Sequence, residues 1–136
     1  MDKNRELVDA AIEARKQAHA PYSDFAVGAA VLTKSGKIFK GCNVENLSLR
    51  LTLCAEEVAV GSAVVNGETD LVAIAVVADS KEPVMPCGAC RQLLAEFNPS
   101  MEVVSAKLDG SVERHSLTEL LPKAKQGILK QNSHER

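Results

Sequence analysis

Residues 54–90 read CAEEVAVGSAVVNGETDLVAIAVVADSKEPVMPCGAC, and they carry the strongest structural signals of the sequence. Its first part, Cys54–Val65, has the pattern of a helix that Asn66-Gly67 ends. Leu71–Ala78 is an almost continuous apolar run, which is typical of a strand buried on both faces. A second helix is expected over Cys87–Phe97. The stretch therefore predicts a buried strand between two helices, with a cysteine at the start of each helix.

The N-terminal part of the chain predicts one helix and a hairpin. Apolar residues recur at helical spacing over Asn4–Ala18, and Pro21-Tyr22-Ser23 breaks the pattern. The strand-like runs Ala26–Thr33 and Lys37–Val44 are joined by Lys34-Ser35-Gly36, which is typical of a hairpin turn. This part therefore contributes a helix and two antiparallel strands.

The C-terminal part predicts a short strand and a short helix. Glu102–Lys107 is the strand, and Ser116-Leu117-Thr118-Glu119 has the form of a capping box that opens a helix ending near Pro122. Residues 131–136 are polar and are expected to be a frayed tail. The order α, β, β, α, β, α, β, α predicts a mixed α/β sheet with helices on its faces, in a single domain over residues 1–136.

The composition limits the classes of function. Of the 136 residues, 46% are hydrophobic, which suffices for one sizeable core. The formal net charge is -2 and no basic stripe is present, which argues against nucleic acid as a partner. The charged N-terminus precedes no long apolar run, so neither a secretory signal nor a membrane span is expected. Four cysteines without such a signal indicate reduced thiols or metal ligands in a cytoplasmic protein.

The cysteines predict a metal site. Cys87 and Cys90 are one helical turn apart, so both sulfurs can reach one ion, and Cys54 approaches it from the other helix. Three thiolates can hold Zn²⁺ and leave its fourth position for water. A helix start favours thiolate, so position alone is expected to ionise Cys54 and Cys87. Glu56 is then expected to be a proton shuttle with a raised pKa, and the combination is the general signature of zinc deaminases.

Other interpretations of these residues stay open. The two cysteines at 87 and 90 can form half of a closed structural zinc site, or a redox pair, although no thioredoxin-type pattern surrounds them. A closed site needs a fourth protein ligand, and the candidates are Cys42, His19, His115 and His134. The histidines lack ligand spacing and are interpreted as ordinary surface or core residues. Cys42 is interpreted as a small buried residue beside the site.

Five short motifs are spread along the chain: FAVGAA at 25–30, GCNVEN at 41–46, CAE at 54–56, PCGACRQ at 86–92 and ELLP at 119–122. Through these motifs most of the chain resembles the small, homotetrameric cytidine deaminases. The resemblance implies a three-layer α/β/α fold, built around a mixed sheet of about five strands.

The resemblance also implies roles for individual residues. Cys54, Cys87 and Cys90 would bind one zinc ion per subunit, and Glu56 would be the catalytic proton shuttle. The implied substrate-binding residues are Phe25, which packs on the pyrimidine, Ala55, whose backbone reads the base edge, and Asn43 and Glu45, which bind the sugar hydroxyls. The ligand would be a small nucleoside, and the active sites would be shared between the subunits of a homotetramer.

Three positions depart from the family pattern. Glu57 stands where an Arg is expected to donate hydrogen bonds to sulfur, and Leu49 stands where a Tyr is usual. Lys125 stands where a Phe is expected to reach a neighbouring subunit's base. Arg91 or the helix dipoles are expected to offset the negative charge of the thiolates instead. The stretch 53–67 is also similar to the corresponding helix of bacterial blasticidin S deaminases, which lack the Arg as well.

The resemblance implies zinc-dependent hydrolytic deamination of cytidine and deoxycytidine, which yields uridine, deoxyuridine and ammonia in pyrimidine salvage. One alternative is the same chemistry on blasticidin S, or on a cytosine nucleoside modified at N4 or C5, because loss of the Tyr and Phe leaves room. A noncatalytic binding module stabilised by zinc is a second alternative. Nucleic-acid editing is a third, and the acidic balance and scarce aromatics argue against it.

Overall fold

The computed structural model describes residues 3–125. Within them, helices and strands alternate much as the sequence predicts. In chain order the elements are α1 (Lys3–Arg15), β1 (Val27–Thr33), β2 (Ile38–Cys42), the short 3-10 helix η1 (Leu49–Leu51), α2 (Ala55–Val65), β3 (Leu71–Ala78), α3 (Gly88–Phe97), β4 (Glu102–Lys107), β5 (Val112–Ser116) and α4 (Leu117–Leu120).

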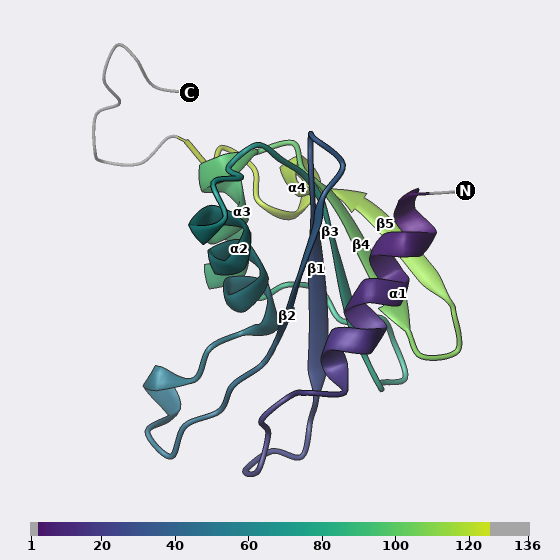
Figure 1. Cartoon of the computed structure of the whole chain (residues 1–136), viewed down its shortest axis with the longest axis vertical. Coiled ribbons are helices and arrows are strands. Elements are labelled where there is room, and N and C mark those ends of the chain that lie inside the picture. Colours follow the sequence, from purple (N-terminus) through teal and green to yellow (C-terminus); the bar gives the residue numbers. More distant parts are fainter. Residues whose placement is uncertain (1–2, 126–136) are drawn as a thin grey trace.

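The strands form one five-stranded sheet in the order β2-β1-β3-β4-β5. β3 and β4 pair in parallel, whereas the other neighbours pair antiparallel. Figure 1 shows α1 on one face of the sheet, with α2 and α3 together on the other face. The predicted three-layer α/β/α fold around a mixed sheet is therefore confirmed.

The central strand β3 is buried on both faces. Ile74 and Val76 belong to the core cluster that includes residues of α2 and α3, while Ala75 and Val77 belong to the cluster that includes residues of α1. Successive side chains of a strand point to opposite faces, so a strand covered on both sides needs an apolar residue at almost every position. This explains the unbroken apolar run that the sequence shows.

Two glycines let the helices approach the sheet closely. A Cβ atom on Gly28 would lie 2.0 Å from the carbonyl oxygen of Ala11 in α1. A Cβ atom on Gly41 would lie 2.4 Å from the carbonyl oxygen of Ala55 in α2. Both distances are far below van der Waals contact, so only glycine fits without displacing backbone. Gly41 thereby brings the start of α2, with its cysteine string, onto strand β2.

The fifth strand, β5, was not located by the sequence patterns. It pairs antiparallel with β4, and the two strands are joined by a tight turn in which the Lys107 amide donates to the Ser111 carbonyl at 2.9 Å. Gly110 has a φ of +94°, a conformation that favours glycine. Asp109-Gly110 is therefore the hairpin signal that marks this strand, and the short, polar β5 carries little apolar alternation beside it.

Some element boundaries also differ from the predictions. α1 ends at Arg15, three residues before the predicted end. β2 ends at Cys42, and Val44 forms only isolated bridges, with His19 and Leu53. α4 is a single turn ending at Leu120. The predicted frayed tail, 131–136, lies outside the described residues.

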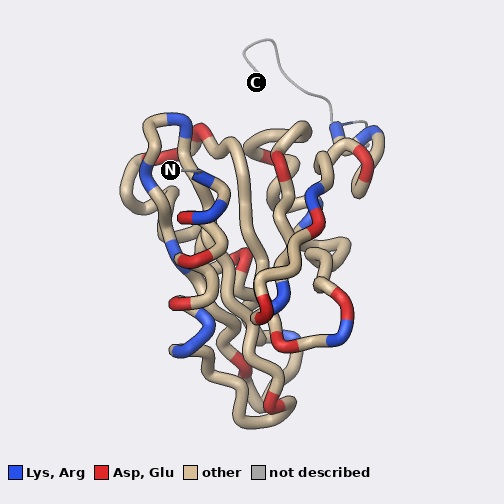
Figure 2. The backbone as a smooth tube through the Cα atoms, turned by 90° about the vertical axis from the view of Figure 1, so that its right-hand side faces the viewer, with Lys and Arg blue, Asp and Glu red and all other residues tan. Residues whose placement is uncertain are grey.

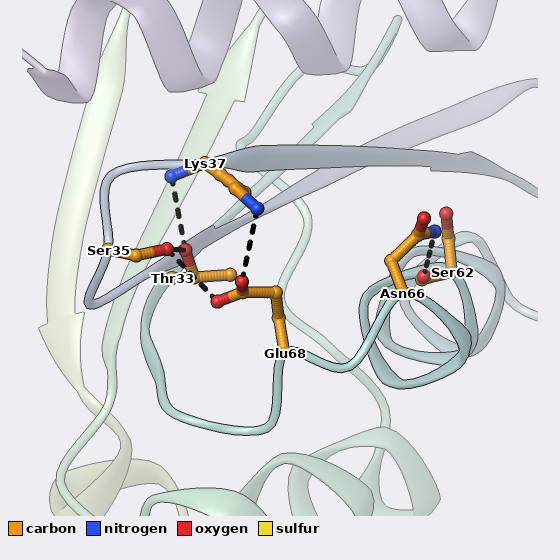
Figure 3. Close-up of polar contacts among 6 residues, drawn as sticks. All are labelled: Thr33, Ser35, Lys37, Ser62, Asn66 and Glu68. Atoms are coloured by element: carbon orange, nitrogen blue, oxygen red, sulfur yellow. Dashed lines mark hydrogen bonds and ion pairs between the residues drawn. The ribbon is translucent and has the colours of Figure 1, made fainter.

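A small polar cluster fastens the β1–β2 hairpin to the loop after α2 (Figure 3). The Ser35 hydroxyl donates to Glu68 at 3.0 Å and lies 2.9 Å from the hydroxyl of the buried Thr33. The Lys37 ammonium forms an ion pair with Glu68 at 3.4 Å. The loop itself follows the C-cap Asn66 and thus begins where the sequence predicts that α2 ends. The far end of the hairpin is therefore held by side chains as well as by the sheet.

The surface carries both signs of charge. Figure 2 shows Lys and Arg interspersed with Asp and Glu along the described chain, without a basic stripe in that view. Among residues 3–125, every helix is too short or too polar to cross a membrane.

Candidate metal centre and active site

Three thiols meet where α2 and α3 begin. Cys54 is the N-cap of α2, Cys87 is the N-cap of α3, and Cys90 lies one turn into α3. Their Sγ atoms all lie within 4.8 Å of one another, a grouping of thiols that could hold one metal ion. The structure thus brings together the three cysteines that the spacing predicts as ligands.

The donor set fits a cation such as Zn²⁺. Burial raises the pKa of the Cys54 thiol to about 11, with further contributions from the negative charges of Glu56, Cys87 and Glu57. Burial and the charge on Glu56 also raise the pKa of Cys90. Burial of Cys54 therefore opposes the ionisation that its position at the helix start is predicted to favour. Clustered, desolvated thiols lose their protons in exchange for a metal, and the two helix starts then favour the resulting negative charge.

Within residues 3–125, these thiols form the one group of three or more potential ligands with metal-like spacing. Cys42 does not complete it. Cys42 pairs with Gly28, which faces α1, so the Cys42 side chain lies on the opposite face of the sheet from the thiol cluster. The interpretation of Cys42 as a neighbour of the site is therefore wrong.

The histidines do not complete the cluster either. The ring of His115 lies 3.2 Å from the Glu113 carboxylate on β5, and the backbone of His19 bridges to Val44. His134 lies outside the described residues. Among the described residues the cluster thus offers three cysteine ligands, and three protein ligands are the number typical of catalytic zinc sites.

Glu56 lies in the first turn of α2 and is only 5% exposed. Burial raises the pKa of its carboxyl group, and the charge of Glu57 adds to the rise. A carboxyl group whose pKa is raised by burial holds its proton more readily than an exposed one, which favours general acid–base catalysis. Glu56 is thus buried with a raised pKa, as predicted, and its role as a proton shuttle stays a prediction.

A cavity of about 320 Å³ opens beside Cys54, Glu56 and Cys87. This volume lies in the range of small-molecule sites. Its walls come from the ends of β1 and β2, the start of α2, strand β3 and the loop before α3. The lining residues are Phe25, Val27, Asn43, Thr52, Leu53, Cys54, Ala55, Glu56, Val76, Val84, Met85 and Cys87. A larger groove, of about 620 Å³, lies between α1 and the β4–β5 hairpin, away from the thiols. The smaller cavity is therefore the candidate substrate site, because Cys54, Glu56 and Cys87 line it.

Three of the predicted substrate-binding residues line this cavity: Phe25, Asn43 and Ala55. The Asn43 side chain accepts from the Val27 amide at 2.9 Å and donates to the Phe25 carbonyl at 2.9 Å. Asn43 therefore holds in place the backbone that leads into β1, and this backbone carries the Phe25 ring.

Glu45 is not among the lining residues of the cavity. Its Oε1 atom accepts from the backbone amides of Tyr22 at 3.0 Å and Ser23 at 3.1 Å, and its other oxygen accepts from the Ser23 hydroxyl. These hydrogen bonds lower the pKa of Glu45. The carboxylate thus anchors the turn before Phe25, and its role toward a sugar stays a prediction, as does that of Asn43.

Two charged residues that the sequence relates to the thiolate charge, Glu57 and Arg91, form hydrogen bonds with backbone groups. The Glu57 carboxylate turns back and accepts a hydrogen bond of 2.7 Å from the Cys54 amide. The Arg91 guanidinium donates to the carbonyls of Pro86 at 2.8 Å and Leu120 at 3.0 Å. Arg91 thus holds the segment before Cys87 against α4, a positioning role that the sequence did not reveal.

The other two departures from the family pattern lie on the surface. Leu49 is strongly exposed on η1. The Lys125 ammonium donates to the Glu96 carbonyl of α3 at 3.3 Å, on its own chain.

Known proteins that are similar to this chain include zinc-binding deaminases, which agrees with the thiol cluster. A family model described as "Cytidine and deoxycytidylate deaminase zinc-binding region" matches residues 1–106. A cytidine deaminase of Halalkalibacterium halodurans is 50% identical over 119 residues, which cover 87% of this chain and 90% of that protein. A blasticidin-S deaminase of Bacillus cereus is 36% identical over 104 residues, which cover 71% of this chain and 74% of that protein. The crystal structure of a cytidine deaminase from Burkholderia pseudomallei superposes with a TM-score of 0.86 at 47% identity, covering 90% of this chain and 98% of that one.

Proposed function

The chain belongs to the cytidine and deoxycytidylate deaminase family, and we propose that it hydrolyses cytidine and deoxycytidine to uridine, deoxyuridine and ammonia. The observation that carries this proposal is the meeting of three clustered thiols with the buried Glu56 at one small-molecule cavity. A nucleoside is neutral, and its base needs apolar walls with a few polar groups, as this cavity has.

We assign Cys54, Cys87 and Cys90 as the zinc ligands. Zinc bound there supplies a Lewis acid that lowers the pKa of water from 15.7 to about 7. The chain's own contribution is proton transfer by Glu56. Its carboxylate takes one proton from the attacking water and delivers it to N3 of the cytosine ring. It then takes the second proton of that water, now the hydroxyl on C4, and delivers it to the departing amine. One water is consumed and one ammonia released.

The remaining proposed contacts orient the nucleoside. The Phe25 ring packs on the pyrimidine, and the backbone of Ala55 at the start of α2 reads the base edge. The amide nitrogen of Asn43 has two hydrogens, of which one goes to the Phe25 carbonyl, so the other is available to a sugar hydroxyl. Glu45 is proposed to accept from the sugar as well, through the carboxylate that otherwise binds Ser23.

We also propose a homotetramer whose active sites are completed between subunits. Four leucines in the segment before α2 are exposed: Leu47 at 79%, Leu49 at 76%, Leu51 at 54% and Leu53 at 45%. An apolar surface of this kind is typical of a protein interface, and Leu53 also lines the cavity. Light scattering tests this proposal, and Leu49→Glu is expected to shift the particle toward smaller assemblies.

We also propose that the chain is a single domain, that it lies in the cytoplasm and that it acts in pyrimidine salvage. The four cysteines are free thiols, which suits a reducing compartment. No partner among nucleic acids is proposed, since Lys and Arg are interspersed with Asp and Glu along the described chain in the view of Figure 2.

A second candidate function is deamination of blasticidin S, which the relative from Bacillus cereus favours. The Glu57 carboxylate does not support it, because that group caps α2 instead of facing a ligand. Turnover of cytidine, deoxycytidine, blasticidin S and a cytosine-containing single-stranded oligonucleotide by the zinc-loaded protein distinguishes the candidates. The proposal expects the two nucleosides to be preferred. If neither cytidine nor deoxycytidine is turned over, the proposal is contradicted. Turnover of blasticidin S would then favour the second candidate. Turnover of the oligonucleotide would favour nucleic-acid editing.

A further inference from the structure

One wall of the cavity is made by a methionine that a buried hydroxyl holds in place. Met85 lies in the loop before α3 and lines the cavity. Its thioether sulfur accepts a hydrogen bond of 3.5 Å from Ser105, which is completely buried on β4. Ser105 pairs in register with Val76 of β3, which also lines the cavity. The methionine therefore covers a buried hydroxyl beside the cavity.

The proposed reaction fixes how a cytosine ring lies against this wall. C4 must face the thiol cluster, which lies between the start of α2 and the start of α3. N3, one ring neighbour of C4, must face Glu56 on the α2 side. C5 is the other ring neighbour of C4, so it faces the α3 side, where Val84 and Met85 line the cavity.

We propose that Met85 determines specificity at C5 of the base, and that Ser105 positions it. This inference rests on the proposed function and goes beyond it. Met85 limits the substituent at C5 to a small one, because its side chain fills the space next to that atom. A methionine alone is flexible and yields to a larger group. The hydrogen bond opposes such a movement, since it would leave the buried Ser105 hydroxyl without its acceptor.

The test compares cytidine with 5-iodocytidine as the ratio of their kcat/KM values. Met85→Ala is expected to raise the ratio of iodinated to plain substrate by at least about tenfold, the usual scale for apolar pocket discrimination. Met85→Leu keeps the volume in a branched side chain, which is less flexible than methionine and does not depend on the hydrogen bond to stay in place, so it is expected to leave the ratio within about threefold. Val27→Ala, which enlarges the cavity from β1, is the matched control and is expected to leave the ratio unchanged.

The positioning role of Ser105 has its own test. Ser105→Ala is expected to raise the ratio by several-fold in the wild-type background. It is expected to have no effect on the ratio in the Met85→Leu background, where no sulfur accepts the hydrogen bond. A merely structural role of Ser105 predicts equal effects in both backgrounds, and that result would overturn the assignment.

Binding of the products gives a readout independent of turnover. The dissociation constants of uridine and 5-iodouridine, measured by calorimetry, are expected to shift in parallel with the kinetic ratios. If the wild type deaminates cytidine but Met85→Ala leaves the ratio of kcat/KM for 5-iodocytidine to that for cytidine unchanged, this inference alone is overturned. A wild-type protein that neither deaminates cytidine nor binds uridine would overturn the proposed function, and the inference with it.

Discussion

The Glu57 carboxylate accepts a hydrogen bond of 2.7 Å from the backbone amide of Cys54. The contact joins the third residue of α2 to its N-cap, and it satisfies one of the amides that a helix start leaves without a partner. Because Cys54 is also a thiol of the metal centre, the same bond fixes the backbone that carries that sulfur. Glu57 thus stabilises the site through the helix start, whereas the family's Arg is expected to act on sulfur directly.

Removal of this cap is expected to weaken the fold modestly. Glu57→Ala should lower the free energy of unfolding by about 1 kcal/mol, because the Cys54 amide loses its acceptor. Glu57→Gln keeps an acceptor oxygen and should lose less than half as much. Urea denaturation of both variants measures the difference. Equal losses would show that charge, and not the hydrogen bond, is what Glu57 contributes.

Gly41 is expected to tolerate no side chain. Gly41→Ala places a Cβ atom 2.4 Å from backbone atoms of both Ala55 and Ala59, so α2 must move away from β2. We expect a loss of about 1–3 kcal/mol in the free energy of unfolding and a lower zinc content, since the start of α2 carries Cys54.

The matched control is Gly61→Ala, in the interior of the same helix. A Cβ atom there meets nothing within 4 Å, so the substitution should stabilise the protein by about 0.5–1 kcal/mol. Thermal unfolding and zinc analysis of both variants provide the check. A stable, zinc-replete Gly41→Ala protein would contradict the close packing of α2 on β2.

The cluster around Glu68 is expected to make stability depend on pH. Hydrogen bonds from Ser35 and Lys37 and the charge of Lys37 lower the pKa of Glu68 below its ordinary value of 4.5. A carboxyl group with a depressed folded-state pKa stabilises the fold above its ordinary pKa, and this contribution disappears as the pH falls through the folded-state pKa.

Glu68→Gln should therefore melt at a lower temperature than the wild type at pH 7, and the difference should shrink steadily below pH 4.5. Melting temperatures from pH 7 to pH 3.5 test this. Glu82→Gln, which changes an exposed carboxylate in the loop before α3, is the control. A difference that stays constant over the whole range would mean that the charge of Glu68 does not matter.

The sequence predicts the metal ligands well because their chemistry depends on spacing along helices. Cys87 and Cys90 must share one face of α3, whatever surrounds them. The central strand is also evident, since burial on both faces imposes an apolar run. Strand β5 is less evident, because a polar edge strand carries no strong pattern and only Asp109-Gly110 marks the turn before it.

Other features depend on the folded geometry and could not be predicted. Which face of the sheet Cys42 occupies follows from its register with Gly28, and a shift of one residue would reverse it. The direction of the Glu57 side chain depends on its rotamer. Desolvation of the Cys54 thiol depends on residues distant in sequence, so the rise in its pKa could not be predicted from the helix start alone.

Glu56 is expected to move protons at a centre held by three cysteines. Zinc content and cytidine turnover of Glu56→Gln test it most directly, with Glu57→Gln as the neighbouring control. We expect Glu56→Gln to bind one zinc per chain and to lose turnover by at least about 10²-fold, while Glu57→Gln stays within about tenfold of the wild type. Wild-type turnover by Glu56→Gln, with its zinc intact, would show that Glu56 is not the proton shuttle.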